Sequence, residues 1–222
     1  FAGTGEKGYS GDGGPAAKAK FGGIYSVAFD AAGKNIVLAD LDNRRVRRIE
    51  LASGMVTTVA GNGEKGVPAD DAEAAKSPLV DPRAACFDSQ GSVYVLERSG
   101  NALRVVTPDG KIRTVAGTGK AGATGDGGDA KLATLHGPKH LCADKDDNII
   151  IADTENHLIR KHLVKEGRIV RIAGSGKKGT TGINGPPLAV ELNQPHGIYL
   201  HPAGELYIVD SSNNRVLKIV KE

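Results

Sequence analysis

The stretch AGTG at residues 116–119 decides the fold, because the pattern AG-x-G recurs along the chain at nearly constant intervals. Successive copies begin 58, 56 and 57 residues apart. A fixed period of this length is typical of repeat architectures, in which one small unit of structure is copied along the chain. The copies lie at residues 2–5, 60–63, 116–119 and 173–176. The 222 residues are therefore expected to form a single domain (1–222) with repeats at approximately 3–60, 61–116, 117–173 and 174–222.

Each complete repeat contains four short segments that are typical of β-strands. The second segment is rich in Val, Ile or Tyr, as in NIIIAD at 148–153, which suits a strand buried on both faces. Polar turns separate the segments, and pairs such as Asp109-Gly110 favour hairpin connections. Four strands in meander order make one propeller blade. The predicted fold class is all-β, a β-propeller of four-stranded antiparallel blades.

Several motifs resemble NHL repeats. They are GDGGPA at 11–16, ADLDNRRVR at 39–47, TVAGTG at 114–119 and ADTENHLIRK at 152–161. The resemblance covers the whole chain in four copies, and it implies a β-propeller, usually with six blades. Three arrangements therefore stay open: a ring that closes with four blades, a piece of a larger propeller, or a ring completed by several chains. We favour a fragment of a larger NHL propeller. An alternative is that the chain is an excised or engineered fragment that self-assembles, so that a homo-oligomer completes the ring.

Composition and charge exclude some classes of protein. The 29 basic and 26 acidic residues are too evenly balanced to favour nucleic-acid binding, and the aromatic residues do not cluster with the arginines. Two cysteines exclude a disulfide-rich scaffold and a four-cysteine zinc site. No apolar run approaches the roughly 20 residues that would span a membrane. The chain shows no signal peptide, and the compartment stays open, with an extracellular or periplasmic location favoured.

Acids and arginines recur at matched positions and are interpreted as structural. An acid ends each second strand, where it can accept hydrogen bonds from backbone N–H groups of the next turn. An arginine follows seven residues later in three repeats, within reach of the acid across the hairpin. A catalytic residue would be unique rather than repeated. The acids are Asp40, Glu97, Asp153 and Asp210, and the arginines are Arg47, Arg104 and Arg160, with Leu217 in the fourth repeat.

No cofactor is predicted, although Ca²⁺ and Zn²⁺ are considered. Asp12 and Asp126 in the GDGG loops are interpreted as helix N-caps, since one carboxylate per loop is too few for calcium. His140 and His196 fall on inner strands, where propeller lyases similar to this family place metal ligands. Two histidines without a third ligand make a weak zinc site. His157 and His162 are expected to be exposed.

The starts of the first strands differ between repeats and therefore carry the functional hypothesis. Tyr25, Arg83, Lys139 and His196 occupy this position, at equivalent heights around one mouth of the predicted channel. Three of them can be cationic, which favours an anionic group. We expect a non-catalytic binding or scaffolding module for a protein or a small anionic ligand. The alternative is a hydrolase or lyase with a divalent metal in the channel.

Overall fold

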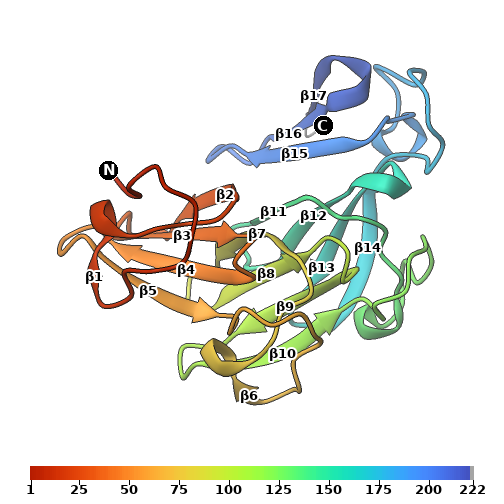
Figure 1. Ribbon diagram of the computed structural model, residues 1–222. Helices are drawn as coiled ribbons and strands as arrows, with labels where there is room; N and C mark the ends of the chain where they lie inside the picture. The colour runs from red at the N-terminus through yellow and green to blue at the C-terminus, as the bar shows by residue number, and fades with distance from the viewer. Residues whose placement is uncertain (221–222) are drawn as a thin grey trace. The chain divides into compact units, whose positions relative to one another are not determined.

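The computed structural model describes residues 1–220 and is all-β (Figure 1). Its regular structure consists of short strands and single turns of 3-10 helix. Adjacent strands pair in antiparallel order within four sheets, each of which is one propeller blade. Across the described residues, no helix is long and apolar enough to cross a membrane. The predicted fold class is confirmed.

Two compact units divide the chain. The first contains Phe1–Glu97 and Leu103–Thr114, and it holds the first sheet and most of the second. The second contains Arg98–Ala102 and the residues from Val115 onward, and it holds the last two sheets. Each unit is described by itself.

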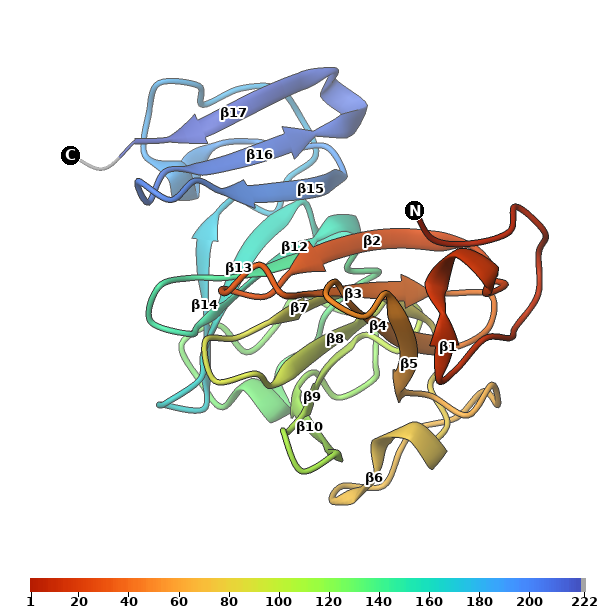
Figure 2. The ribbon, with the colours of Figure 1, turned by 90° about the vertical axis from the view of Figure 1, so that its left-hand side faces the viewer.

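The first unit contains two five-stranded sheets, in which a two-residue strand pairs with the outer edge of a four-stranded meander. Figure 2 shows β2, β3 and β4 following one another in the first of them. The strand orders are β1-β5-β4-β3-β2 and β6-β10-β9-β8-β7. The first sheet comprises β1 (Gly14–Pro15), β2 (Ile24–Phe29), β3 (Asn35–Asp40), β4 (Arg45–Glu50) and β5 (Met55–Ala60). The second comprises β6 (Ala72–Glu73), β7 (Pro82–Phe87), β8 (Val93–Glu97), β9 (Ala102–Val106) and β10 (Lys111–Ala116).

The second unit contains a four-stranded sheet and a sheet with three described strands, both in meander order. The third sheet comprises β11 (His140–Ala143), β12 (Ile149–Asp153), β13 (Leu158–Leu163) and β14 (Arg168–Ala173). The fourth comprises β15 (Pro195–Leu200), β16 (Leu206–Asp210) and β17 (Arg215–Ile219). The 3-10 turns are η1 (Ala16–Lys18), η2 (Ala74–Lys76), η3 (Ala130–Leu132), η4 (Thr154–Asn156), η5 (Pro187–Ala189) and η6 (Ser211–Asn213).

Small and branched apolar side chains fill the space between neighbouring sheets. In the first unit, Val37 and Val46 of the first sheet are buried in one cluster with Ala85 and Val95 of the second. The second unit has an equivalent cluster. Residues that alternate along these strands reach opposite faces of a sheet, so each blade can contribute to a core on either side. The buried strand segments expected from the apolar runs thus form the contacts between blades.

Close backbone packing explains why AG-x-G recurs. Gly61, which follows β5, has a φ of +94°, and a Cβ atom there would lie 2.1 Å from the carbonyl oxygen of Arg44. Gly117 and Gly174 repeat this geometry against the carbonyl oxygens of Asn101 and His157. Any other side chain would collide with the polar turn that precedes the third strand. The repeated glycine is therefore where the end of the fourth strand meets that turn.

Candidate binding site

The repeated acids hold the linker that enters their own blade. Asp40 is fully buried, and its Oδ1 accepts a hydrogen bond of 2.6 Å from the backbone N–H of Gly22, at the end of the linker. Asn43 donates to the other carboxylate oxygen at 2.8 Å. The same linker bond recurs in the other repeats, from Val80 to Glu97, from His136 to Asp153 and from Asn193 to Asp210. These contacts give the acids an architectural role in every blade.

The arginine of the third strand lies against this acid in three blades. Arg104 donates to Glu97 Oε2 from both Nε and Nη2, at 2.8 and 2.6 Å. Arg160 reaches Asp153 Oδ2 at 3.3 Å, and Arg47 lies 3.6 Å from Asp40 Oδ2. Because Arg47 and Arg160 are fully buried, their charges need carboxylate partners inside the protein.

The GDGG aspartates provide these partners, so their interpretation as N-caps is wrong. Asp12 accepts from Arg47 Nε at 3.1 Å and lies 2.8 Å from its Nη2. Asp126 makes the same contacts with Arg160, at 2.9 and 2.8 Å. The residue that caps η3 is Asp129, whose carboxylate accepts from the backbone N–H of Lys131. Each of these carboxylates pairs with a buried guanidinium rather than with the backbone of a surface turn. The sequence does not show that the aspartate and the arginine are neighbours in space.

The fourth blade replaces this network. Leu217 stands where the other repeats have arginine, and Ile183 stands where the first and third have the GDGG aspartate. Arg215, two residues before Leu217, donates from Nε to Asp210 Oδ2 at 2.7 Å. The sequence analysis missed Arg215. The fourth repeat lacks both the arginine and the GDGG aspartate, and this joint absence could have indicated that another cation pairs with Asp210.

The pKa values of these carboxyl groups are shifted in opposite directions, although burial raises the pKa of each. Burial raises the pKa of Asp153 to about 6, even though Asn156, the backbone of His136 and Arg160 all stabilise the ionised form. Burial also raises the pKa of Asp40. For Asp12 burial acts the same way, but hydrogen bonds from Thr58 and Tyr9, together with Arg47, outweigh it and lower the pKa. Asp12 and Asp40 share the Arg47 guanidinium, and the more deeply buried Asp40 holds its proton more strongly.

The residues at the starts of the first strands lie on β-bulges or beside a strand start. The register shifts between Ile24 and Ser26 in the first sheet, which leaves Tyr25 outside the ladder. Equivalent shifts flank Arg83 and His196. Lys139 lies directly before β11, and its N–H donates to the carbonyl of Ala152. Bulges redirect a side chain away from the regular alternation of a strand. The sequence gives no sign of these bulges.

In the first unit the structure brings Tyr25 and Arg83 together. The Arg83 guanidinium carbon lies 4.2 Å from the centre of the Tyr25 ring, and Nη1 donates to the Tyr25 carbonyl at 3.2 Å. The Tyr25 side chain is half exposed, at 51%. A cation stacked on an exposed aromatic ring is held in place at little entropic cost.

In the second unit the structure brings Lys139 and His196 together. Lys139 Nζ lies 2.9 Å from His196 Nε2 and 3.0 Å from Glu155 Oε1. An ammonium group can only donate, so this contact requires a lone pair on Nε2 of a neutral imidazole. Gln194 donates to the other oxygen of Glu155 at 2.7 Å. The sequence analysis did not identify Glu155 or Gln194.

Glu155 balances the charge of Lys139. Burial of the carboxyl opposes its ionisation, but hydrogen bonds from Lys139 and Gln194 outweigh burial and lower its pKa. The cluster therefore holds an ionised pair beside a neutral histidine. Whether Tyr25 and Arg83 share one channel mouth with Lys139 and His196 stays a prediction, because the two pairs belong to different units.

A lysine lies beside one of the two histidines considered as channel-metal ligands. His140 opens β11 and His196 lies on β15, but the Lys139 ammonium stands at Nε2 of His196. A divalent cation bound there would meet this positive charge. In residues 1–220, no group of three or more His, Cys, Asp or Glu side chains is arranged to hold a metal ion.

Two other sequence-based expectations concern histidine and cysteine. His162 is buried rather than exposed, because β13 is an interior strand of the third sheet, and burial lowers its pKa. His157 is partly buried, and its Nδ1 accepts from the backbone of Gln194. Burial raises the pKa of Cys142 to about 12, so its thiolate is scarce at neutral pH. Cys86 is buried as well.

Comparison with known proteins finds a repeat family that matches two segments of the chain. The model of the NHL repeat matches residues 135–161 and 192–219. A region of the protein SUPPRESSOR OF QUENCHING 1, chloroplastic, from Arabidopsis thaliana is 24% identical to this chain over 211 residues. That alignment covers 90% of this chain and 20% of the plant protein. The chain thus spans about a fifth of this relative.

Solved structures share the fold. An auxiliary nutrient binding protein from Bacteroides ovatus superposes with a TM-score of 0.68 and 18% identity, over 92% of this chain and 49% of the other. A gluconolactonase from Xanthomonas campestris superposes with a TM-score of 0.62 and 15% identity, over 90% of this chain and 58% of the other. At these identities the likeness concerns the fold alone, and it includes both a binding protein and an enzyme.

Proposed function

We propose, from the premise that this chain is an NHL-repeat β-propeller, that it is a non-catalytic binding or scaffolding module for a protein or a small anionic ligand. The proposal rests on the residues at the starts of the first strands, Tyr25, Arg83, Lys139 and His196. These positions depart from the repeat, and three of their residues lie on bulges that take them out of the ladder. They present cations, Arg83 and Lys139, on fixed supports. A repeat protein acquires specificity where its copies differ, because the shared residues already serve the fold.

The use of the other polar residues supports a non-catalytic role. The repeated acids accept hydrogen bonds from linker N–H groups and from arginine, asparagine or both. Their carboxylate oxygens are therefore already bonded and are not available to act as a general base. Cys142, with its raised pKa, is a poor nucleophile at neutral pH. Charged groups held at the strand starts are suited to recognition rather than to bond cleavage.

A metal-dependent hydrolase or lyase is the second candidate. It is supported by the structural likeness to a gluconolactonase. The Lys139 ammonium at His196 opposes it. Elemental analysis of the purified protein separates the two: a stoichiometric divalent metal that is lost in His196→Ala would favour the enzyme.

Binding of a polycarboxylate probe tests the proposal. We would titrate citrate into the protein by isothermal calorimetry at low salt, with Arg83→Met and Lys139→Met as site variants. Arg48→Met is the matched control, because Arg48 is exposed on β4, away from the strand starts. We expect each site variant to weaken citrate binding at least about fivefold, the loss of one charge-assisted contact. Equal affinities in all variants, or no binding in any, would contradict the proposal.

A further inference from the structure

A hollow in the first unit lies apart from the strand-start residues and has both charged and apolar atoms in its walls. It has a volume of about 500 Å³, which is within the usual size range of small-ligand sites. Its walls come from the N-terminal loop, the start of β4, β5 and the segment around η2. The residues that matter here are Tyr9, Asp12, Arg45, Thr58, Asn62 and Lys76.

Asp12 fixes one wall of the hollow. Its Oδ2 accepts hydrogen bonds of 2.7 Å from the hydroxyls of both Tyr9 and Thr58, and its Oδ1 pairs with Arg47. Arg47 is fully buried, so it offsets the carboxylate charge from behind. Asp12 uses the protons of both hydroxyls, so the wall presents the Tyr9 ring in a fixed position, and its one carboxylate is already paired.

Arg45 supplies the positive charge. Its guanidinium carbon lies 3.6 Å from the centre of the Tyr9 ring, and it donates to the backbone carbonyls of Asn43 and Asn62. Its Nε is buried and, among the described residues, has no hydrogen-bond partner. Guanidinium donors left without acceptors are costly, and an oxyanion close to them would lower that cost.

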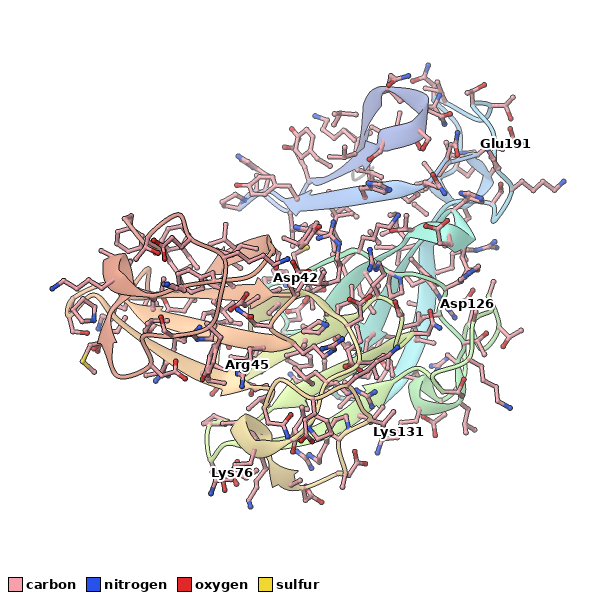
Figure 3. All side chains as sticks on the ribbon, viewed as in Figure 1. Asp42, Arg45, Lys76, Asp126, Lys131 and Glu191 are labelled. Atoms are coloured by element: carbon pink, nitrogen blue, oxygen red, sulfur yellow. The ribbon has the colours of Figure 1, made fainter. Side chains whose placement is uncertain are left out.

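Lys76 adds a second cation at the rim. It is paired with Glu73 at 2.9 Å, and its side chain is 77% exposed. Figure 3 labels Arg45, at the start of β4, and Lys76, at the end of η2, and both belong to the first unit. Together they give the hollow the charge that a bound anion requires.

The hollow is specific to the first repeat. Val67, Ala123 and Thr180 stand where Tyr9 does, so the aromatic wall is missing from the other repeats. Ala102 and Leu158 replace Arg45, and the fourth repeat has Arg215, which is already bonded to Asp210. Residues that serve the fold recur in this chain, whereas Tyr9 and Arg45 do not occur together again. This argues for a ligand rather than for an architectural need.

We propose that the hollow binds a small oxyanion, a carboxylate or phosphate group, between Arg45 and Lys76, with the Tyr9 ring holding the guanidinium in place. The site is separate from the strand-start residues and does not depend on the function proposed for them. A carboxylate would come from an acidic peptide or metabolite, and a phosphate from the free ion or a phosphate ester. Both groups are planar or tetrahedral arrays of acceptors that a guanidinium and an ammonium recognise.

Titration with simple ions, followed by ¹H–¹⁵N NMR at low salt, tests the site. Inorganic phosphate and sodium acetate are the two arms, and their relative affinities tell which oxyanion is preferred. We expect saturable shifts at the amides of Tyr9, Asn62 and Lys76 with at least one of the ions. Arg45→Met should weaken that binding at least tenfold, and Lys76→Met severalfold.

Matched controls keep the test decisive. Arg48→Met removes an exposed arginine from the same strand and should leave the affinity unchanged. Lys76→Met alters an exposed side chain and should leave the fold intact even if Arg45→Met proves unstable. The proposal is overturned if neither ion gives saturable shifts at these amides. It is also overturned if Lys76→Met, like the control Arg48→Met, binds the ions as tightly as the unaltered protein. Shifts confined to Arg83 and Lys139 would support the strand-start site and overturn this one.

Discussion

At the scale of single residues, one glycine in each of the first three blades packs against a backbone carbonyl and leaves no room for a side chain. Gly61 lies directly beneath the carbonyl of Arg44, which itself has a positive φ of 49°. Asn101 and His157 have the same left-handed conformation and likewise lie against a glycine, Gly117 or Gly174. Backbone strain and close approach are thus paired at the same point of the repeat.

Replacement of Gly61 by alanine should destabilise the protein far more than replacement of Gly33. Both have positive φ values, +94° and +63°, so both replacements incur a conformational cost of about 1–2 kcal/mol. At Gly61 a Cβ atom would in addition lie 2.1 Å from a backbone oxygen, whereas at Gly33 nothing lies within 4 Å. We expect a total loss above about 3 kcal/mol for Gly61→Ala, measured by urea unfolding. Equal losses for the two variants would show that close packing is unimportant.

Asp153 should make stability depend on pH in an unusual direction. Its native pKa of about 6 lies above the ordinary value of 3.8, so the folded state holds the proton more tightly than the unfolded state. The contribution of this carboxyl to stability is therefore fully present below about pH 4 and is lost as the pH rises through 6.

The variant Asp153→Asn isolates this effect, because asparagine does not titrate. The free energy of unfolding of the unaltered protein minus that of the variant should fall between pH 4 and pH 7, by up to about 3 kcal/mol. Titrations of other groups cancel in this difference. A difference that rises over the same range would mean that the ionised, arginine-paired form is the preferred one.

At the scale of the blade, the linker bond is constant and the arginine network varies. All four acids accept the N–H of a residue at the end of the linker. The guanidinium that balances them comes from the third strand at residue 47, 104 or 160, or from Arg215. The blades therefore share the hydrogen bond from the linker to the acid. They differ in which position of the third strand supplies the arginine that pairs with the acid.

The pair Arg160 and Asp126 should behave as one unit in a double-mutant cycle. Arg160→Leu alone leaves two carboxylates near the core without their cation and should cost about 3–5 kcal/mol. Adding Asp126→Ile reproduces the Leu217 and Ile183 pair of the fourth repeat and should recover about 1–3 kcal/mol as coupling energy.

An exposed pair provides the reference for this cycle. Glu166 and Arg168 are 3.2 Å apart but about half exposed, so the same cycle with Glu166→Ile and Arg168→Leu should give a coupling below about 1 kcal/mol. Strict additivity at Arg160 and Asp126 would contradict the view that they form one buried network.

Strand-level features could be predicted from the sequence only where they repeat. The second strands, the hairpin turns and the reach of Arg104 to Glu97 follow from patterns with a fixed period. The bulges at Tyr25, Arg83 and His196 could not be predicted, because a bulge depends on how a strand fits its neighbour. The partners of Asp12 and Asp126 were misassigned because they lie 35 and 34 residues from their arginines.

At the scale of the whole molecule, some apolar strand faces lack a covering layer. Val27 and Phe29 of β2 are each 62% exposed. Their counterparts in the second repeat, Ala85 and Phe87, are 2% and 9% exposed, because they pack against the first sheet. The face of β2 therefore has the composition of a surface between blades, and we expect it to be covered by another blade or another copy of the chain.

Phe29→Glu should weaken self-association of this chain. A charge placed on this face would have to be desolvated on contact, so the dissociation constant should rise at least tenfold in sedimentation equilibrium. Leu132→Glu is the control, because Leu132 is 72% exposed on a single turn of 3-10 helix. A chain that stays monomeric at every concentration would contradict the expectation.

The amino-acid sequence by itself determined the period, the strand meander, the hairpin turns and the positions of the paired acids and arginines. These depend on interactions between near neighbours, and each was repeated often enough to be recognised. The tertiary structure decided which side chains meet: Arg83 with Tyr25, Lys139 with His196 and Glu155, Arg215 with Asp210. Those contacts join residues of different repeats or depend on bulges and strand register, which arise only once the sheets have formed and packed together.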